Sequence, residues 1–183
     1  MTPETMERFP PLVVALKNGA EVTIRPLSSD DGEALAAFYA GVPREDVRFY
    51  CPHPLDRAHA LENAGRALSP YEVVLVLETP SGICGYAWYR WKDDAAEKSG
   101  FGICVARPYH GAGAGRALMA RLLEIARVVG PPVMCLTVQL ANTRAVKLYT
   151  RMGFRVVREQ MLERDPAAEW PSELEYYMEQ RVR

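Results

Sequence analysis

Residues 103–118 read ICVARPYHGAGAGRAL. An apolar, β-branched run leads here into the start of an amphipathic helical pattern, and glycines occupy positions 111, 113 and 115 between them. Because glycine has no Cβ, such a turn lets a ligand approach the backbone closely. The N–H groups of residues 111–116 lie at the start of the predicted helix, where they have no partner within the helix. The stretch therefore predicts a phosphate- or pyrophosphate-binding turn.

Two known phosphate-binding loops do not match this stretch. A Walker loop places Lys and then Ser or Thr after its last glycine, whereas Arg116 and Ala117 follow here. A dinucleotide-binding loop has G-x-G-x-x-G spacing and usually opens its domain, whereas this G-x-G-x-G run lies past the middle of the chain. On the loop alone, close packing of a helix against a sheet explains the glycines equally well.

Strand and helix patterns alternate on both sides of the glycine turn. Before it we expect a hairpin around Asn18-Gly19, and after it a closing hairpin near the end of the chain. Residues 44–54 are turn-rich and look irregular. The predicted strands are 11–27 (a pair), 71–77, 83–91, 100–106, 133–138, 153–157 and 174–182, and the predicted helices are 28–41, 55–68, 114–129 and 142–152. This order predicts a mixed α/β fold with a central, largely antiparallel sheet flanked by helices.

Length and composition are those of one globular domain. The chain has 183 residues, of which 49% are hydrophobic and 25% charged, and no linker divides it, so we expect one domain over 1–183 with residues 1–10 flexible. A net charge of -1 argues against a nucleic-acid partner. No apolar run reaches the roughly 18 residues of a membrane span or resembles a signal peptide. The four scattered cysteines predict reduced thiols, and hence a soluble protein in the cytoplasm.

Two motifs together resemble the GNAT superfamily of acyl-CoA N-acyltransferases. The first is His110-Gly-Ala-Gly-Ala-Gly115, preceded by a strand that ends Val105-Ala-Arg-Pro108. The second combines a strand, an Asn that opens a helix, a Leu-Tyr pair and a Gly-Phe pair, here Leu136-Thr-Val138, Asn142, Ala145, Leu148-Tyr149 and Gly153-Phe154. The resemblance covers residues 21–157. Within the family, the Asn18-Gly19 hairpin, residues 23–27 and Arg48-Phe-Tyr50 look most like the branch with protein-lysine acetyltransferase domains.

The resemblance implies a site for acetyl-CoA as acyl donor. Backbone groups on the strand before the loop would pair with the pantetheine arm, a backbone N–H near Val105 would stabilise the oxyanion, and the loop would hold the pyrophosphate. Asn142 would contact the pantetheine, although it also fits a plain helix N-cap. The implied cofactor-binding residues are Ile103, Cys104, Val105, His110, Gly111, Ala112, Gly113, Ala114, Gly115, Arg116 and Asn142.

Tyr149 is the implied catalytic general acid. A phenol at this place can protonate the departing CoA thiolate, although a tyrosine packed under the sheet would have the same sequence context. The usual general-base glutamate, five residues before Val105, is replaced by Gly100; Glu97 or a water relay would have to serve instead. His110 also departs from the usual Arg or Gln, but a histidine can still donate to phosphate. We expect direct transfer in a ternary complex, with no covalent enzyme intermediate.

Several alternatives remain open at this stage. The absence of an acid at Gly100 leaves a non-catalytic CoA-binding regulatory module as the rival function. The acceptor amine belongs either to a small molecule or to a protein, and the chain is a monomer or a homodimer. Cys51 and His53 are too few to make a metal site, so no metal is expected. Aromatic clusters at 88–91 and 176–177 fit packing better than an acceptor pocket.

Overall fold

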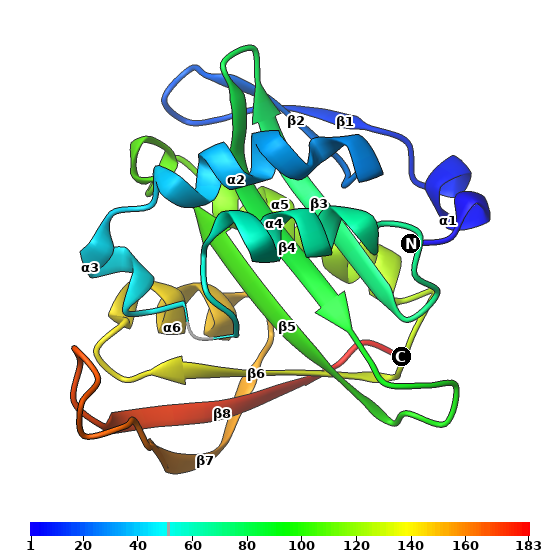
Figure 1. The fold of residues 1–183 in the computed structure, drawn as a ribbon. Helices are drawn as coiled ribbons and strands as arrows, with labels where there is room; N and C mark the ends of the chain where they lie inside the picture. The colour runs from blue at the N-terminus through cyan, green and yellow to red at the C-terminus, as the bar shows by residue number, and fades with distance from the viewer. Residues whose placement is uncertain (51) are drawn as a thin grey trace.

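A computed structural model describes residues 1–50 and 52–183 of the chain. It contains one sheet with helices on both faces (Figure 1). The strands are β1 (Leu12–Ala15), β2 (Glu21–Pro26), β3 (Glu72–Thr79), β4 (Gly82–Arg90), β5 (Lys98–Val105), β6 (Val133–Gln139), β7 (Arg155–Leu162) and β8 (Glu173–Arg181). The helices are α1 (Pro3–Arg8), α2 (Gly32–Ala40), α3 (Arg44–Val47), α4 (Arg57–Gly65), α5 (Ala114–Ala126) and α6 (Thr143–Arg151), with 3-10 turns at Ser29–Asp31 and Arg107–Tyr109.

The sheet has the strand order β1-β2-β3-β4-β5-β6-β8-β7. Neighbouring strands are antiparallel except β5 and β6, which run parallel. Strand β8 lies between β6 and β7, so the last hairpin of the chain pairs with β6 through β8 and forms one edge of the sheet. The predicted mixed α/β class with a largely antiparallel sheet is confirmed.

Helices divide the core into two layers. Helix α5 packs on one face over Leu75, Leu77 and Phe101, and its own Leu118, Leu122 and Ile125 are fully buried there. Helices α2 and α4 cover the other face, where Leu35 and Tyr39 pack against Val76 and Tyr86. Apolar spacing of three to four residues in α5 and the continuous apolar run of β3 account for these two layers.

Strands β5 and β6 separate along their length. They pair only from Lys98–Val133 to Gly100–Cys135, although β5 continues to Val105 and β6 to Gln139. Beyond these pairs, among the described residues, β5 is paired as a strand with β4 alone and β6 with β8 alone. The sheet therefore opens at one place, and we call the space between residues 101–105 and residues 136–139 the gap.

Three segments differ from the sequence-based expectation. The turn-rich segment 44–54 contains the short helix α3, which begins after Pro43. Strand β7 continues to Leu162, because β8 pairs with it as far as Glu173. Residues 1–10, expected to be flexible, contain helix α1, which begins with Pro3 and is capped by Thr2. Met1 and Phe9 are 2% and 7% exposed, so the apolar ends of this segment pack against the α5-side core.

Candidate functional site

One edge of the gap is formed by the backbone of β5. Ala106 N–H donates to Cys84 O at 2.8 Å, in register with the Tyr86–Cys104 pair. Because hydrogen-bonded and non-hydrogen-bonded pairs alternate along antiparallel strands, Cys104 also directs its backbone groups to β4. Ile103 and Val105 direct theirs into the gap. The expectation that all three residues pair with a ligand through their backbone is therefore corrected: Ile103 and Val105 can, and Cys104 cannot.

The glycine loop closes one end of the gap. Gly111 and Gly113 have φ values of +76° and +99°, and a Cβ added to either would meet no atom within 4 Å. Both glycines are thus needed for backbone conformation, and the space in front of them is open. Gly115 differs, because a Cβ there would approach Leu148 Cδ2 at 3.4 Å, so this glycine serves the close packing of α5 and α6.

The loop presents a group of backbone donors. The first intrahelical bond of α5 runs from Ala117 N–H to Gly113 O at 2.9 Å. Outside the bonds internal to α5, the N–H groups of residues 111–116 have no acceptor at 3.5 Å or less in the described part of the chain. Lys17 N–H donates to Ala112 O at 2.9 Å and thereby fixes the loop against the β1–β2 turn. Unpaired donors at the positive end of a 13-residue helix favour a bound anion.

His110 lies between the loop and the gap. Its Nε2 lies 2.6 Å from Val105 O, so the protonated Nε2 donates to that carbonyl. Burial lowers the pKa of His110 below its usual range, the bond to Val105 opposes this, and Arg144 adds to the lowering. In this arrangement the neutral imidazole is hydrogen-bonded to the Val105 carbonyl. The N–H of Val105 remains available to a ligand in the gap.

Helix α6 supplies the two other predicted site residues. Asn142 is its N-cap and accepts from Ala145 N–H at 3.2 Å, so the plain capping role is present. Tyr149 is 7% exposed, and its ring packs edge-on against Phe101 with centroids 6.0 Å apart. Its hydroxyl forms no hydrogen bond within the described residues. Burial, and then the nearby Cys104 thiol, raise the pKa of Tyr149, so the phenol stays protonated.

The indole of Trp88, on β4, lies against the position on β5 where the family usually has its general-base glutamate. Trp88 pairs with Gly102 across the strands, and a Cβ on Gly102 would lie 2.5 Å from indole Cε2. A Cβ on Gly100 would lie 3.3 Å from Cζ3 of the same ring. The indole therefore covers both glycines on the α2/α4 face. The Glu97 side chain forms no hydrogen bond or ion pair with the described residues, and its role as a base stays a prediction.

A tyrosine and a histidine from the segment before α4 adjoin that indole. Trp88 Nε1 donates to the Tyr50 hydroxyl at 2.9 Å, and the same hydroxyl lies 3.1 Å from His53 Nε2. The sequence alone linked Tyr50 only to the likeness with one branch of the family. It pointed to His53 only as one of two possible metal ligands, too few for a site, and the other, Cys51, lies outside the described residues. A Tyr-x-x-His spacing in a turn-rich segment was the available signal, but it does not reveal a partner 38 residues away.

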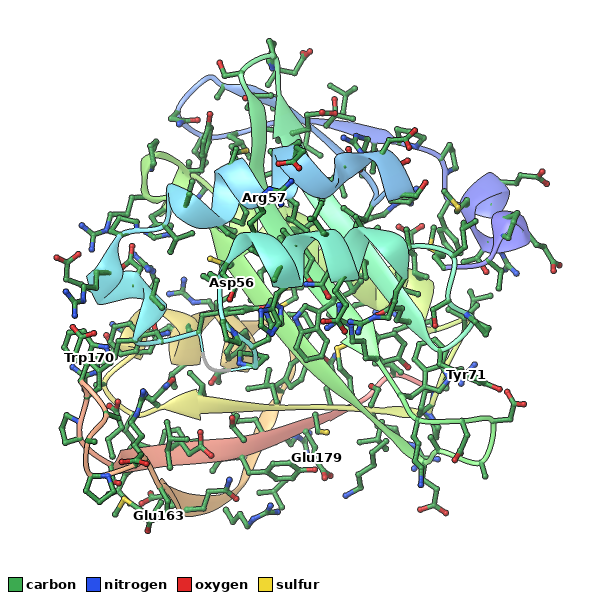
Figure 2. The ribbon with its side chains drawn as sticks, in the orientation of Figure 1. Asp56, Arg57, Tyr71, Glu163, Trp170 and Glu179 are labelled. Atoms are coloured by element: carbon green, nitrogen blue, oxygen red, sulfur yellow. The ribbon has the colours of Figure 1, made fainter. Side chains whose placement is uncertain are left out.

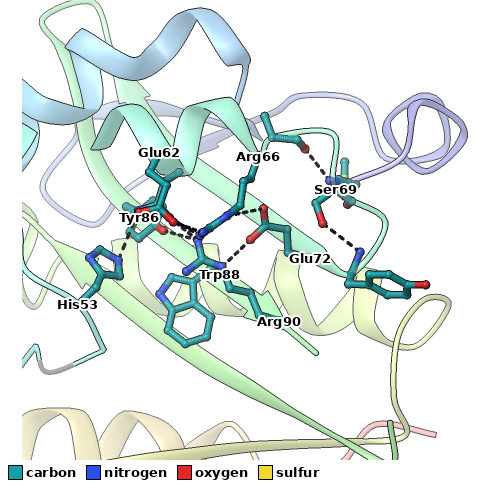
Figure 3. Close-up of polar contacts among 12 residues, drawn as sticks. His53, Glu62, Arg66, Ser69, Glu72, Tyr86, Trp88 and Arg90 are labelled. Carbon is teal, nitrogen blue, oxygen red and sulfur yellow. Dashed lines mark hydrogen bonds and ion pairs between the residues drawn. The ribbon is translucent and has the colours of Figure 1, made fainter. Parts of the chain in front are cut away.

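A buried polar network continues from this cluster under α4 (Figure 3). Arg90 donates to Glu72 at 2.6 Å, to Asn63 Oδ1 at 2.7 Å and to the Tyr86 hydroxyl at 3.0 Å. Asn63 in turn donates to the Tyr39 hydroxyl at 3.1 Å. These bonds hold α2 and α4 on the sheet and fix the wall behind His53. Glu72 Oε1 accepts no hydrogen bond and lies 3.6 Å from Arg66 Nε.

Sequence comparison identifies the family once this geometry is known. A sequence model of the Acetyltransferase (GNAT) family matches residues 34–154, which include the glycine loop, the gap and α6. The chain belongs to the GNAT acetyltransferase family. Mycothiol acetyltransferase from Kineococcus radiotolerans is 38% identical over 84 residues, which are 45% of this chain and 26% of that protein. The match thus spans about a quarter of the relative's length.

Solved structures share the GNAT fold. The GNAT domain of S. lividans PAT has a TM-score of 0.76 at 19% identity, with 93% of this chain and 96% of that chain covered. An acetyltransferase of the GNAT family from Streptococcus pneumoniae gives 0.73 at 22%, covering 87% and 99%. YncA from Salmonella typhimurium, solved with acetyl-CoA, gives 0.70 at 24%, covering 88% and 94%. At these identities the likeness establishes the fold.

Two further features of the described residues concern metals and membranes. Outside position 51, no group of three or more His, Cys, Asp and Glu side chains is arranged to hold a metal ion. No helix between residues 1–50 or 52–183 is long and apolar enough to cross a bilayer. Tyr89 of β4 is fully buried and donates to Pro131 O at 2.7 Å.

Proposed function

We propose that this protein is an N-acetyltransferase that transfers the acetyl group of acetyl-CoA to a primary amine of a small molecule or protein. The observation that supports this most is the gap between β5 and β6, with unpaired backbone donors at its end and Tyr149 on its α5 side. An extended ligand with a phosphate end and a thioester end fits such a gap. Acetyl-CoA has both.

The residues present fit this substrate. Donors of residues 111–116 suit a pyrophosphate, and the open space in front of Gly111 and Gly113 admits it. Ile103 can pair through both its backbone groups with the pantetheine arm, as an added strand would. Val105 offers its N–H, because His110 Nε2 is bonded to its carbonyl. Asn142 keeps its side-chain N–H groups available, because only its Oδ1 is used in the cap.

Direct transfer is the chemistry that these residues support. The amine lone pair attacks the thioester carbonyl carbon, the C–N bond forms, and the C–S bond breaks with its electron pair on sulfur. Tyr149 gives its proton to that thiolate, and the amine nitrogen loses a proton that restores the phenol. The Val105 N–H lies in the gap to stabilise charge on the carbonyl oxygen. No covalent enzyme intermediate is needed.

One observation favours a non-catalytic CoA-binding module as a second candidate. On β5 the place of a carboxylate base is covered by the Trp88 indole, so Gly100 cannot be replaced by an acid without moving this ring. The two candidates differ in a single result: only an enzyme releases CoA thiol when an amine is added.

Free thiols at Cys84 and Cys104 fit the reducing cytoplasm, where we place the protein.

Titration calorimetry with acetyl-CoA tests the cofactor site. We expect micromolar binding by the wild type and none by Gly113→Glu, which puts a carboxylate in front of the donors. Gly82→Glu is the control, because Gly82 also has a positive φ and open space but lies on the β3–β4 turn. Loss of binding in both variants, or in neither, would contradict the assigned site.

Thiol release tests the transfer itself. The wild type is mixed with acetyl-CoA and a panel of primary amines: spermidine, glucosamine, free amino acids and a lysine-containing peptide. Release of CoA with one class of amine identifies the acceptor class and supports the enzyme. Tight binding of acetyl-CoA without release for any amine would favour the regulatory module.

A further inference from the structure

Residues 48–50 cross the gap on the α2/α4 side of the sheet. Gln139 Nε2 at the end of β6 donates to Arg48 O at 3.3 Å, and Arg48 pairs with Glu173 of β8 at 2.7 Å. The ring centroid of Trp170, which is labelled in Figure 2, lies 5.6 Å from the Arg48 guanidinium. Two residues later, Tyr50 is bonded to Trp88 of β4. The segment is thus attached to both halves of the sheet where they separate.

The Tyr50 hydroxyl has one hydrogen-bonding position left. His53 Nδ1 lies 2.8 Å from Pro54 O, a carbonyl, so Nδ1 bears the ring proton and Nε2 is the acceptor. Tyr50 must therefore donate its proton to Nε2, at 3.1 Å, and accept from Trp88 Nε1 with one lone pair. A hydroxyl oxygen has two lone pairs. The second can accept an N–H from a ligand in the gap.

We propose that Tyr50 and His53 form the proton relay for the acceptor amine. Tyr50 accepts an N–H of the bound ammonium group, and His53 Nε2 receives the proton that the Tyr50 hydroxyl releases. The inference rests on the proposed acetyl transfer. It assigns a base on the same face of β5 where Gly100 and Gly102 offer none, and opposite the face of Tyr149.

The relay balances the protons of the reaction. One proton of the ammonium ion passes to Tyr50 while the Tyr50 proton passes to His53, which leaves a neutral amine, a neutral phenol and an imidazolium. The amine then attacks the thioester, and its second proton replaces the one that Tyr149 gives to the CoA thiolate. The partly exposed His53 releases its proton to water. The net products are the amide, CoA thiol and one free proton.

The surroundings of His53 keep it neutral between turnovers. Burial lowers the pKa of His53, and the positive groups around it lower it further. Burial also raises the pKa of Tyr50, so the phenol is protonated and able to donate. The titratable and charged groups that face His53 are Tyr39 of α2, Tyr50, His59 of α4, Arg66 after α4, and Tyr86 and Arg90 of β4.

Kinetics against pH test the relay, with the amine that the panel identifies. In the wild type, kcat/KM should rise with pH only up to the pKa of His53, below the usual value of about 6.5, and then stay level. His53→Gln and Tyr50→Phe should lower it roughly 100-fold or more near pH 7. Their kcat/KM should instead rise steadily to about pH 9, because only amine already deprotonated in solution reacts.

Two controls separate the relay from folding and from the cofactor site. His59→Gln removes the ring stacked on His53, with centroids 5.7 Å apart, but no member of the relay, and should keep kcat/KM within about twofold. All variants should bind acetyl-CoA with the wild-type Kd. His53→Gln with wild-type kcat/KM and an unchanged pH profile would overturn the relay while leaving the acetyltransferase intact. A wild type that binds acetyl-CoA but acetylates no amine would overturn both.

The imidazole NMR signals of His53 give a readout without turnover. The Tyr50 hydroxyl bonds to neutral His53, so Tyr50→Phe should raise the pKa of His53 toward its usual value. An unchanged pKa would show that the two groups are not coupled and would overturn the relay. If Tyr50→Phe does not fold, the same NMR signals give the tautomer of wild-type His53. A neutral ring with its proton on Nε2 in place of Nδ1 could not receive the Tyr50 proton and would overturn the relay.

Discussion

The indole of Trp88 lies so close to Gly102 that a Cβ at this position would be 2.5 Å from Cε2 and 2.6 Å from Nε1. These two residues are direct cross-strand partners on β4 and β5. The same ring donates its N–H to Tyr50 and lies under the Arg90 guanidinium, 4.8 Å from the ring centroid. Its position is therefore held from three sides, and the ring cannot easily yield to a side chain on β5.

Gly102→Ala should destabilise the fold. Overpacking against a fixed ring costs about 1–3 kcal/mol, which should lower the free energy of unfolding by that amount in urea denaturation. Gly65→Ala is the matched control, because a Cβ at Gly65 meets nothing within 4 Å. It lies at the end of α4 and should leave stability unchanged or slightly higher. Equal effects of the two substitutions would show that Trp88 moves freely.

Tyr149→Phe should separate chemistry from binding. The hydroxyl has no protein partner in the described residues, so its removal should change the free energy of unfolding by less than about 0.5 kcal/mol. Loss of the acid that protonates the thiolate should lower kcat roughly 100-fold or more, with the Kd for acetyl-CoA unchanged.

Tyr176→Phe is the control for Tyr149, because Tyr176 packs against the same α5-side core from β8. It should keep the wild-type kcat. A Tyr149→Phe enzyme with wild-type kcat would mean that water or another group protonates the leaving thiolate.

Stability should fall as the solution becomes acidic. Burial lowers the pKa of both His110 and His53 in the folded protein, so the unfolded chain binds their protons first. The free energy of unfolding should therefore decrease as the pH falls from about 6.5 through the folded pKa values, by at most about 1.4 kcal/mol per pH unit for each group.

Urea denaturation of His110→Asn at several pH values checks this. The variant should show a shallower decline than the wild type below about pH 6.5, and the two slopes should agree above about pH 8, where histidine is neutral in both states. Parallel curves over the whole range would mean that His110 titrates alike in the folded and unfolded chain.

Local patterns predicted much of the fold, and pairings between distant segments were what they could not predict. Asn18-Gly19 marks the first hairpin, and the glycines before α5 mark the loop, because both depend on backbone conformations that few residues adopt. The insertion of β8 between β6 and β7 depends on the whole sheet.

The candidate site divides in the same way. The loop and Tyr149 lie in motifs that are continuous in sequence. Trp88 and Tyr50 meet only through the fold, and the alternation that turns Cys104 toward β4 depends on a pairing register that composition does not encode.

Cys104→Ala should retain acetyl transfer. Cys104 lies on the gap strand close to the predicted site, so it is the residue that a covalent mechanism would use. Burial raises the pKa of its thiol to about 12, and a thiol rather than a thiolate is a weak nucleophile. The variant should therefore keep kcat within about threefold of the wild type, with any loss due to the small cavity left by the sulfur.

Cys84→Ala, which removes a buried thiol on β4, controls for that cavity. A Cys104→Ala protein that binds acetyl-CoA with the wild-type Kd but releases no thiol would refute direct transfer, because Cys104 would then have to accept the acetyl group itself.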